Sequence, residues 1–360
     1  MQPKPDYSRR KFLKTGVAAS LAFYAMPTVV GAEEEPVGPG MLSSTTYGES
    51  SSAMVVGNPA KIRILQLTDA HFFQPRKEFT DGNERTVGDW KRMVDRYKPD
   101  LVAMTGDLWT DNPDGRGAEF QSAATTWLGE LGVPWLFTWG NHDRLDENVK
   151  GHDIFHDAPN SLYRGGPQQG NYTVSLRNAA GDQVWELLCL NTHRGGVVGD
   201  SYEWLKRLNA LQPKSGVKAV PAFALFHIPL KQYADLRENG GMSGFAFEKV
   251  CNENEDGAAL KELVTHGNVR ACFCGHDHVN DYSGVVDGIE LVYGRSSGWN
   301  AYGFKDVRKG AKLITANAES GSYAWETVFP DGLRWHPEAG KRIEEIIDEP
   351  WLKPTAEMWS

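Results

Sequence analysis

From residue 61 onward, short apolar segments alternate with amphipathic ones, and this pattern constrains the fold more than any other feature of the sequence. Strands are expected at 61–68, 100–106 and 134–140, and helices between them at Arg85–Tyr97 and Ala118–Leu131. Strand–helix–strand units of this kind form parallel strand pairs with right-handed crossovers. The first half of the sequence therefore predicts an α/β fold.

In the second half the expected strands follow one another more closely, which favours antiparallel pairing. These strands are expected at 171–177, 183–191, 222–227, 269–275, 282–286, 289–294 and 311–316, and helices at 202–211 and 258–266. Two mixed β-sheets packed face to face, with helices outside, fit this number of strands. The predicted architecture is a four-layer αββα sandwich.

The composition suits one folded domain with a flexible segment before it. The chain has 360 residues, of which 40% are hydrophobic, enough for a sizeable core. Residues 33–60 are rich in Ser, Gly, Pro and acidic side chains and are predicted to be a linker. The domain is expected at 61–335, and the tail at 336–360 is expected to carry a surface helix at Glu338–Asp348.

The N-terminus resembles a twin-arginine signal peptide spanning residues 1–32. Arg9 and Arg10 precede an apolar stretch, and Val30-Gly31-Ala32 provides the small residues of a cleavage site. A basic tail or a membrane anchor is the alternative, although the apolar run is short for a stable span, and no later segment is long enough. The signal implies export of a folded metalloprotein to the periplasm or beyond, and hence an export machinery as partner.

Removing residues 1–32 would change the net charge from −9 to −13. A strongly acidic body repels polyanions, so nucleic acid is not expected as a partner. The cysteines are expected to be buried free thiols at Cys189, Cys272 and Cys274, with one disulfide left open as an alternative. The state of Cys251 is not predicted.

Polar side chains with metal-binding chemistry follow the apolar strands at five places. They are Asp69-x-His71, Gly106-Asp107, Gly140-Asn141-His142-Asp143, His227 and Gly275-His276-Asp277-His278. Strand ends of this kind meet at one edge of a sheet, so carboxylates, an amide and imidazoles are expected to converge. Such a set of ligands suits transition metals of intermediate hardness.

In this order, the five motifs resemble the calcineurin-like metallophosphoesterases, over about residues 61–304. The resemblance implies the four-layer fold and two divalent or mixed-valence ions of Mn, Fe or Zn. It implies that Asp69, His71, Asp107 and His278 bind one ion, and that Asp107, Asn141, His227 and His276 bind the other. Asp107 would bridge the two ions.

The resemblance also implies hydrolysis of small phosphorylated substrates by a hydroxide that bridges the metals, without a covalent intermediate. His142, oriented by Asp143, would be the catalytic side chain that protonates the leaving oxygen or stabilises charge on the phosphoryl group. Phosphomonoesters are the expected substrates. The alternative is a phosphodiesterase that acts on nucleotides, cyclic nucleotides or glycerophosphodiesters.

Within this family, the blocks at 226–230, 273–282 and 292–303 resemble single-domain purple-acid-phosphatase-like proteins. Purple acid phosphatases carry a metal-binding tyrosine shortly after the Gly-Asp motif, where this chain has Leu108-Trp109-Thr110. Tryptophan cannot ligate a ferric ion, so no purple colour is expected. Mn, Zn and ferrous iron become comparable candidates.

Several residues near the motifs are candidates for contact with substrate, with a structural or solvated role as the alternative for each. They are Arg144, His193, Arg194, Arg295 and the loop 72–84. Trp109 and Trp139 flank two motifs, and packing in an aromatic core is expected for both.

Overall fold

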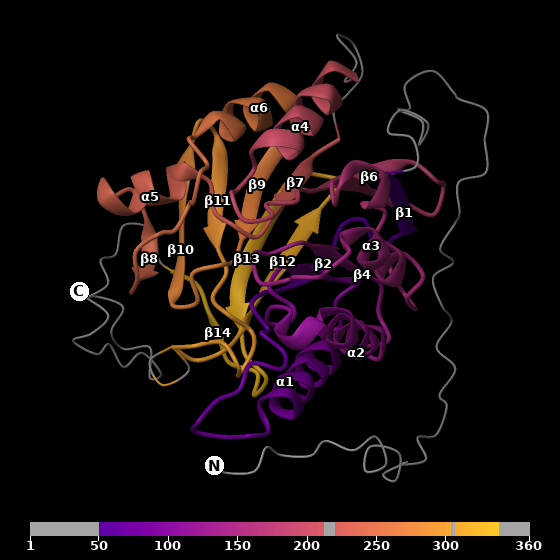
Figure 1. Cartoon of the computed structure of the whole chain (residues 1–360). Helices are drawn as coiled ribbons and strands as arrows, with labels where there is room; N and C mark the ends of the chain where they lie inside the picture. The colour runs from indigo at the N-terminus through magenta and orange to yellow at the C-terminus, as the bar shows by residue number, and fades with distance from the viewer. Residues whose placement is uncertain (1–49, 212–219, 304, 306, 338–360) are drawn as a thin grey trace, which may run out of the picture.

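The computed structural model describes residues 50–211, 220–303, 305 and 307–337. Two β-sheets pack face to face between outer layers of helices (Figure 1). The strands are β1 (Ser51–Val55), β2 (Ile62–Leu67), β3 (Leu101–Thr105), β4 (Trp135–Thr138), β5 (Tyr172–Arg177), β6 (Gln183–Cys189), β7 (Ala222–Leu225), β8 (Ser243–Ala246), β9 (Val269–Cys274), β10 (Asn280–Val286), β11 (Ile289–Tyr293), β12 (Ala311–Asn317), β13 (Ser322–Val328) and β14 (Arg334–Trp335). The α-helices are α1 (Gly82–Tyr97), α2 (Gly117–Gly129), α3 (Asn148–His156), α4 (Gly199–Leu211), α5 (Lys231–Glu238) and α6 (Ala258–His266).

Both sheets are mixed, which confirms the predicted fold class. The eight-stranded sheet has the order β1-β5-β6-β7-β9-β11-β10-β8, and its central strands β6, β7, β9 and β11 are parallel. The six-stranded sheet has the order β14-β13-β12-β2-β3-β4, with β2, β3 and β4 parallel and β12 antiparallel to β2. Parallel strands of this kind are covered on both faces, which explains their nearly continuous apolar sequences.

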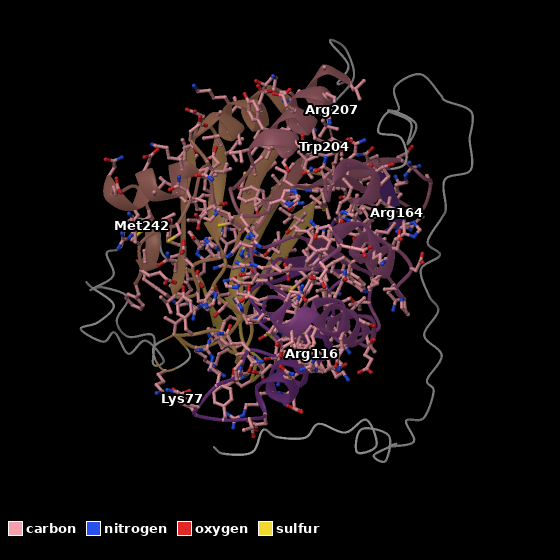
Figure 2. All side chains as sticks on the ribbon, in the orientation of Figure 1. Lys77, Arg116, Arg164, Trp204, Arg207 and Met242 are labelled. Atoms are coloured by element: carbon pink, nitrogen blue, oxygen red, sulfur yellow. The ribbon has the colours of Figure 1, made fainter. Side chains whose placement is uncertain are left out.

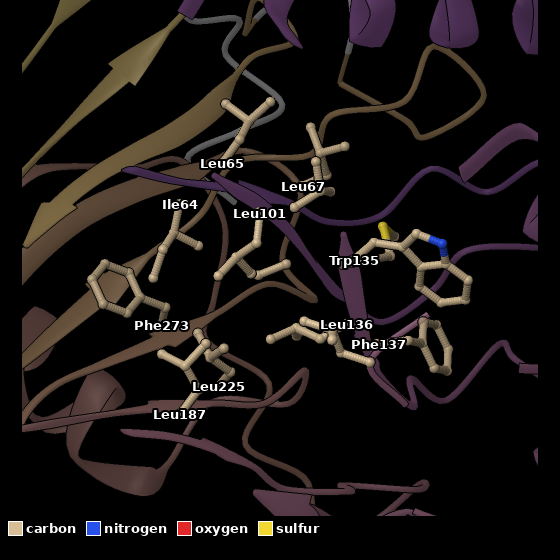
Figure 3. Packing of buried hydrophobic residues seen from close by; sticks show 14 of the residues in the cluster. Ile64, Leu65, Leu67, Leu101, Trp135, Leu136, Phe137, Leu187, Leu225 and Phe273 are labelled. Atoms are coloured by element: carbon tan, nitrogen blue, oxygen red, sulfur yellow. The ribbon is translucent and has the colours of Figure 1, made fainter. Parts of the chain in front are cut away.

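The main core lies between the two sheets. Ile64 of β2 and Leu101 of β3 are fully buried, and they share one cluster with Leu225 of β7 and Phe273 of β9 (Figure 3). A second cluster lies between the outer face of the larger sheet and the helices α4 and α6. Charged side chains such as Lys77, Arg116 and Arg207 are exposed at the periphery (Figure 2).

The folded region begins earlier than the sequence predicted. Residues 51–55, which were assigned to the linker at 33–60, form β1 and pair in parallel with β5. Met54 and Val56 are buried there at 4% and 2% exposure, so this short apolar stretch joins the core despite its serine-rich surroundings. The predicted signal peptide, the first part of the predicted linker and the predicted C-terminal helix lie outside the described residues.

Among the described residues, no helix combines the length and the apolar character that a membrane crossing requires. All four cysteines have free thiols: Cys189, Cys272 and Cys274 are buried, as expected, and Cys251 is exposed.

Candidate metal centre

The predicted metal ligands from both sheets meet at the carboxyl ends of the parallel strands. Asp69 follows β2 and Asp107 follows β3 in the smaller sheet, whereas His227 follows β7 in the larger one. Backbone hydrogen bonds hold these strand ends in register: Asp69 N–H donates to Gly106 O at 3.1 Å, and Gly275 N–H donates to His227 O at 3.1 Å. Motifs more than two hundred residues apart in sequence therefore share one site.

Within the described part of the chain, two groups of three side chains are arranged to hold metal ions. In each group the potential ligand atoms lie within 4.8 Å of one another. One group is Asp69, His71 and His278, and the other is Asp107, His227 and His276. The amide oxygen of Asn141 lies 3.1 Å from His227 Nε2, beside the second group.

Each carboxylate has one oxygen fixed by hydrogen bonds and one oxygen left free. Asp69 Oδ2 accepts hydrogen bonds from the Thr68 hydroxyl (2.8 Å) and from His276 N–H (3.0 Å), and Asp107 Oδ1 accepts one from His142 N–H (2.8 Å). Asp69 Oδ1 and Asp107 Oδ2 are buried and have no hydrogen-bond partner among the described residues. Buried oxygens of this kind destabilise the folded protein unless a cation binds them, so the donor set fits a metal site.

The imidazoles direct their ring nitrogens at the same two oxygens. Asp107 Oδ2 lies 3.4 Å from His71 Nε2 and 3.2 Å from His227 Nε2, so this oxygen stands between the two groups. His227 Nδ1 lies 2.9 Å from the carbonyl oxygen of Thr105, to which it donates when Nε2 carries the lone pair. Metal-binding histidines are usually oriented by such a bond from the other ring nitrogen.

The electrostatics of the site also call for added positive charge. Burial lowers the pKa of His71 and of His276 to about 3, which keeps both rings neutral. Burial acts the same way on His227, but Asp107 and Asp69 outweigh it and raise its pKa to about 10. Burial opposes ionisation of Asp107, yet His227 and His71 hold the pKa of this carboxyl well below its usual value. Ionised carboxylates are thus enclosed where water cannot solvate their charge.

The backbone at the strand ends is strained, as is common at functional sites. Asp69, His71 and Asp107 have φ angles of 53°, 48° and 52°, in the left-handed region. Gly106 has a φ of 85°, and a Cβ at this position would stand 2.6 Å from the ring of His227. The glycine of the Gly-Asp motif is therefore needed both for its conformation and for close approach of the imidazole.

The predicted partnership of His142 with Asp143 is wrong. His142 Nδ1 lies 3.2 Å from Asp111 Oδ1 instead. Both oxygens of Asp143 accept hydrogen bonds from the backbone. Oδ2 accepts from the N–H groups of Asp107 (2.8 Å) and Gly140 (2.7 Å), and Oδ1 accepts from the N–H of Leu108 (2.8 Å). Burial and the charge of Asp107 raise the pKa of Asp143 to about 8, although the N–H groups of Gly140 and Trp109 act the other way. Asp143 thus holds two loops together, and Asp111 is the carboxylate that orients His142.

Contacts in the structure also show where the tryptophans beside the motifs, the position of the missing tyrosine and Arg295 lie. Trp109 and Trp139 are packed in the aromatic core, as expected, with ring centroids 5.9 Å apart. Thr110 occupies the region of the missing tyrosine, and its hydroxyl lies 3.1 Å from His71 Nδ1. Arg295 is buried, and its Nε donates to Asp281 at 2.6 Å, which assigns it the structural role.

Residues 294–298 formally match the G-x-S-x-G pattern of covalent hydrolases. Ser296 is 1% exposed, and its hydroxyl lies 3.4 Å from the carbonyl oxygen of His278 and in contact with the Lys309 ammonium. A nucleophile must be reachable by substrate. This serine is therefore structural.

A pocket of about 360 Å³ adjoins the metal groups. Its lining includes Asn141 and the predicted substrate-contact residues Arg144, His193 and Arg194. His152, which lies outside every sequence motif, also lines it. The pocket has a size that suits a small metabolite.

Comparison with known proteins agrees with this site. Residues 62–280 match the family described as calcineurin-like phosphoesterase. The chain is 28% identical to the "probable inactive purple acid phosphatase 28" of Arabidopsis thaliana, over 74% of this chain and 78% of that protein. It is 25% identical to the 3',5'-cyclic adenosine monophosphate phosphodiesterase CpdA of Escherichia coli, over 64% of this chain and 74% of that protein.

Among solved structures, GAP50, the anchor in the inner membrane complex of Plasmodium, resembles this chain with a TM-score of 0.50. The alignment covers 82% of this chain and 95% of that one at 10% identity. At this identity the likeness concerns the fold alone.

Proposed function

Because the chain belongs to the calcineurin-like phosphoesterase family, we propose that it is an active enzyme that hydrolyses phosphate monoesters with two metal ions. The observation that carries the proposal is the pair of unsatisfied carboxylate oxygens, Asp69 Oδ1 and Asp107 Oδ2, each buried among imidazole nitrogens. When bound, two such cations supply Lewis acidity toward the phosphoryl oxygens and toward an attacking water.

Asp69, His71 and His278 are proposed to hold one ion. Asp107, Asn141, His227 and His276 are proposed to hold the other. Asp107 would belong to both sets of ligands, because its Oδ2 faces an imidazole of each group. Mn, Zn or Fe suits this mixture of nitrogen and oxygen donors. Thr110 offers no phenolate, so we expect no tyrosinate colour.

His142 is proposed to act on the leaving oxygen of the ester. Its ring centroid lies 5.0 Å from that of His71, and its side chain is 34% exposed, so substrate can reach it. Asp111 faces Nδ1, which leaves Nε2 to deliver a proton. Arg144 Nε contacts the same Asp111 oxygen at 3.0 Å and steadies the carboxylate.

The Arabidopsis relative is named as probably inactive, which makes a direct test necessary. In this chain both groups of ligands are complete and buried, which supports activity. Metal-free protein should be loaded with Mn, Zn or ferrous iron and assayed on p-nitrophenyl phosphate and bis-p-nitrophenyl phosphate. We expect the monoester to be hydrolysed faster. Faster cleavage of the diester would instead favour a phosphodiesterase, the activity that the name of the Escherichia coli relative states, and no hydrolysis with any metal would reject the enzyme.

We also propose that the protein is exported in folded form by the twin-arginine route, on the basis of Arg9 and Arg10 before an apolar stretch. Replacing both arginines (Arg9→Lys with Arg10→Lys) is expected to leave most of the protein in the cytoplasm, because the receptor reads the arginine pair. Fractionation and immunoblotting measure this, with Lys11→Arg as control. Export of the double variant at the normal level would refute the route.

A further inference from the structure

The pocket beside the metal groups has an unusual balance of charge for so acidic a protein. Its lining includes two arginines and two histidines, and Asp143 is its one carboxylate. Both oxygens of Asp143 accept hydrogen bonds from backbone N–H groups, so this carboxyl group is already engaged within the protein. Among the charged groups of the lining, the pocket therefore presents arginine donors and no free carboxylate.

The two arginines differ in their availability. Arg144 Nε is engaged by Asp111 and by the carbonyl oxygen of Asn141, each at 3.0 Å. Arg194 makes no hydrogen bond or ion pair with any other residue that the structure describes, and its side chain is exposed at the pocket. An unpaired guanidinium beside a phosphate-processing centre is well suited to bind an oxyanion through two parallel hydrogen bonds.

The loop that carries Arg194 is held in a fixed conformation. His193 has a φ of 43°, in the strained left-handed region, and its backbone N–H donates to Asn191 Oδ1 at 2.8 Å. Asn191 is 1% exposed, and its amide nitrogen donates to the carbonyl oxygen of Gln169 at 2.6 Å. A strained residue held by a buried amide indicates a pre-organised loop rather than a free surface loop.

We infer that this pocket selects phosphomonoesters whose leaving group carries a second anionic group, a carboxylate or a second phosphate, which Arg194 binds. The inference rests on the proposed function, because the first phosphate must occupy the metal centre. A pocket of about 360 Å³ limits the leaving group to the size of a small sugar or hydroxy acid.

The test compares two matched pairs of substrates with the metal-loaded enzyme. They are 3-phosphoglycerate against glycerol 3-phosphate, and fructose 1,6-bisphosphate against fructose 6-phosphate. In at least one pair the substrate with the second anion should have the higher kcat/KM. Arg194→Gln should lower that ratio by about tenfold or more, since a hydrogen bond to a charged group is lost. Arg207→Gln, an exposed arginine on α4 (Figure 2), is the control and should leave the ratio unchanged.

Ratios of one or less in both pairs, or ratios that Arg194→Gln does not lower, would overturn the inference. Titration calorimetry of 3-phosphoglycerate and fructose 1,6-bisphosphate with the metal-loaded protein separates this failure from that of the proposed function. If no ester is hydrolysed, the proposed function fails. The inference that Arg194 binds the second anion is then supported if either ligand binds the wild type at least about tenfold more tightly than Arg194→Gln, and it is rejected otherwise.

Discussion

Asp107→Asn is expected to abolish hydrolysis of p-nitrophenyl phosphate and to reduce the metal content of the purified protein. Asp107 Oδ2 lies close to an imidazole of each group, at 3.4 Å from His71 Nε2 and 3.2 Å from His227 Nε2. Asparagine lacks the negative charge and places either a neutral oxygen or an N–H group there. Loss of an outer partner of a metal ligand already costs about 10–100-fold in affinity or activity, so loss of a shared ligand should cost more.

The fold should survive this substitution. The carbonyl oxygen of the introduced amide can still accept the N–H of His142, and the NH₂ group of that amide can donate to the neighbouring imidazoles. Elemental analysis, activity and thermal unfolding should be measured together, because a loss of metal without a loss of folding identifies a ligand. Asp95→Asn, an exposed carboxyl paired with Lys98 on the surface, is the matched control. An Asp107→Asn protein with full metal content and full turnover would remove Asp107 from the site.

The buried central strands were predictable from the sequence, because a strand covered on both faces is largely apolar. β2, β3, β7 and β9 follow this rule, and their predicted positions are confirmed. Strands at or next to the edges of the sheets do not need such a pattern. β13 is only partly buried, and β8 and β1 are short and contain Ser or Gly, so nothing marked them as strands. Their pairing depends on neighbours far away in the sequence.

Convergence of the motifs was also predictable, since the carboxyl ends of parallel strands share an edge. The partners of each motif residue were not. Asp143 follows His142 in the chain, yet it turns toward the backbone of Asp107, where the left-handed φ of 52° redirects the chain. Asp111, the residue that faces His142, lies on the loop after β3, on the C-terminal side of the Gly-Asp motif, and belongs to no motif. Only the three-dimensional path of the loops decides which carboxylate meets the imidazole.

His142→Ala is expected to leave both metal ions bound and to lower kcat on an alkyl ester such as glycerol 3-phosphate by about 10²–10⁴-fold, the usual contribution of a general acid. The ring of His142 belongs to neither group of metal ligands, and only its backbone N–H supports one, through Asp107 Oδ1. Alanine keeps that N–H. Metal content should therefore equal that of the wild type, in contrast to Asp107→Asn. His156→Ala, an exposed histidine at the end of α3, is the control.

A comparison of two leaving groups reveals what His142 does in this reaction. A p-nitrophenolate departs without a proton, whereas the alkoxide from glycerol 3-phosphate is a far stronger base and needs one. If Nε2 delivers that proton, His142→Ala should slow the alkyl ester much more than the aryl ester, and Asp111→Asn should show the same selectivity in weaker form because it only loosens the ring. Equal losses on both esters would instead assign His142 to stabilising charge on the phosphoryl oxygens, which are common to the two substrates. Full activity on both would exclude His142 from the chemistry, and the proton would then have to come from water.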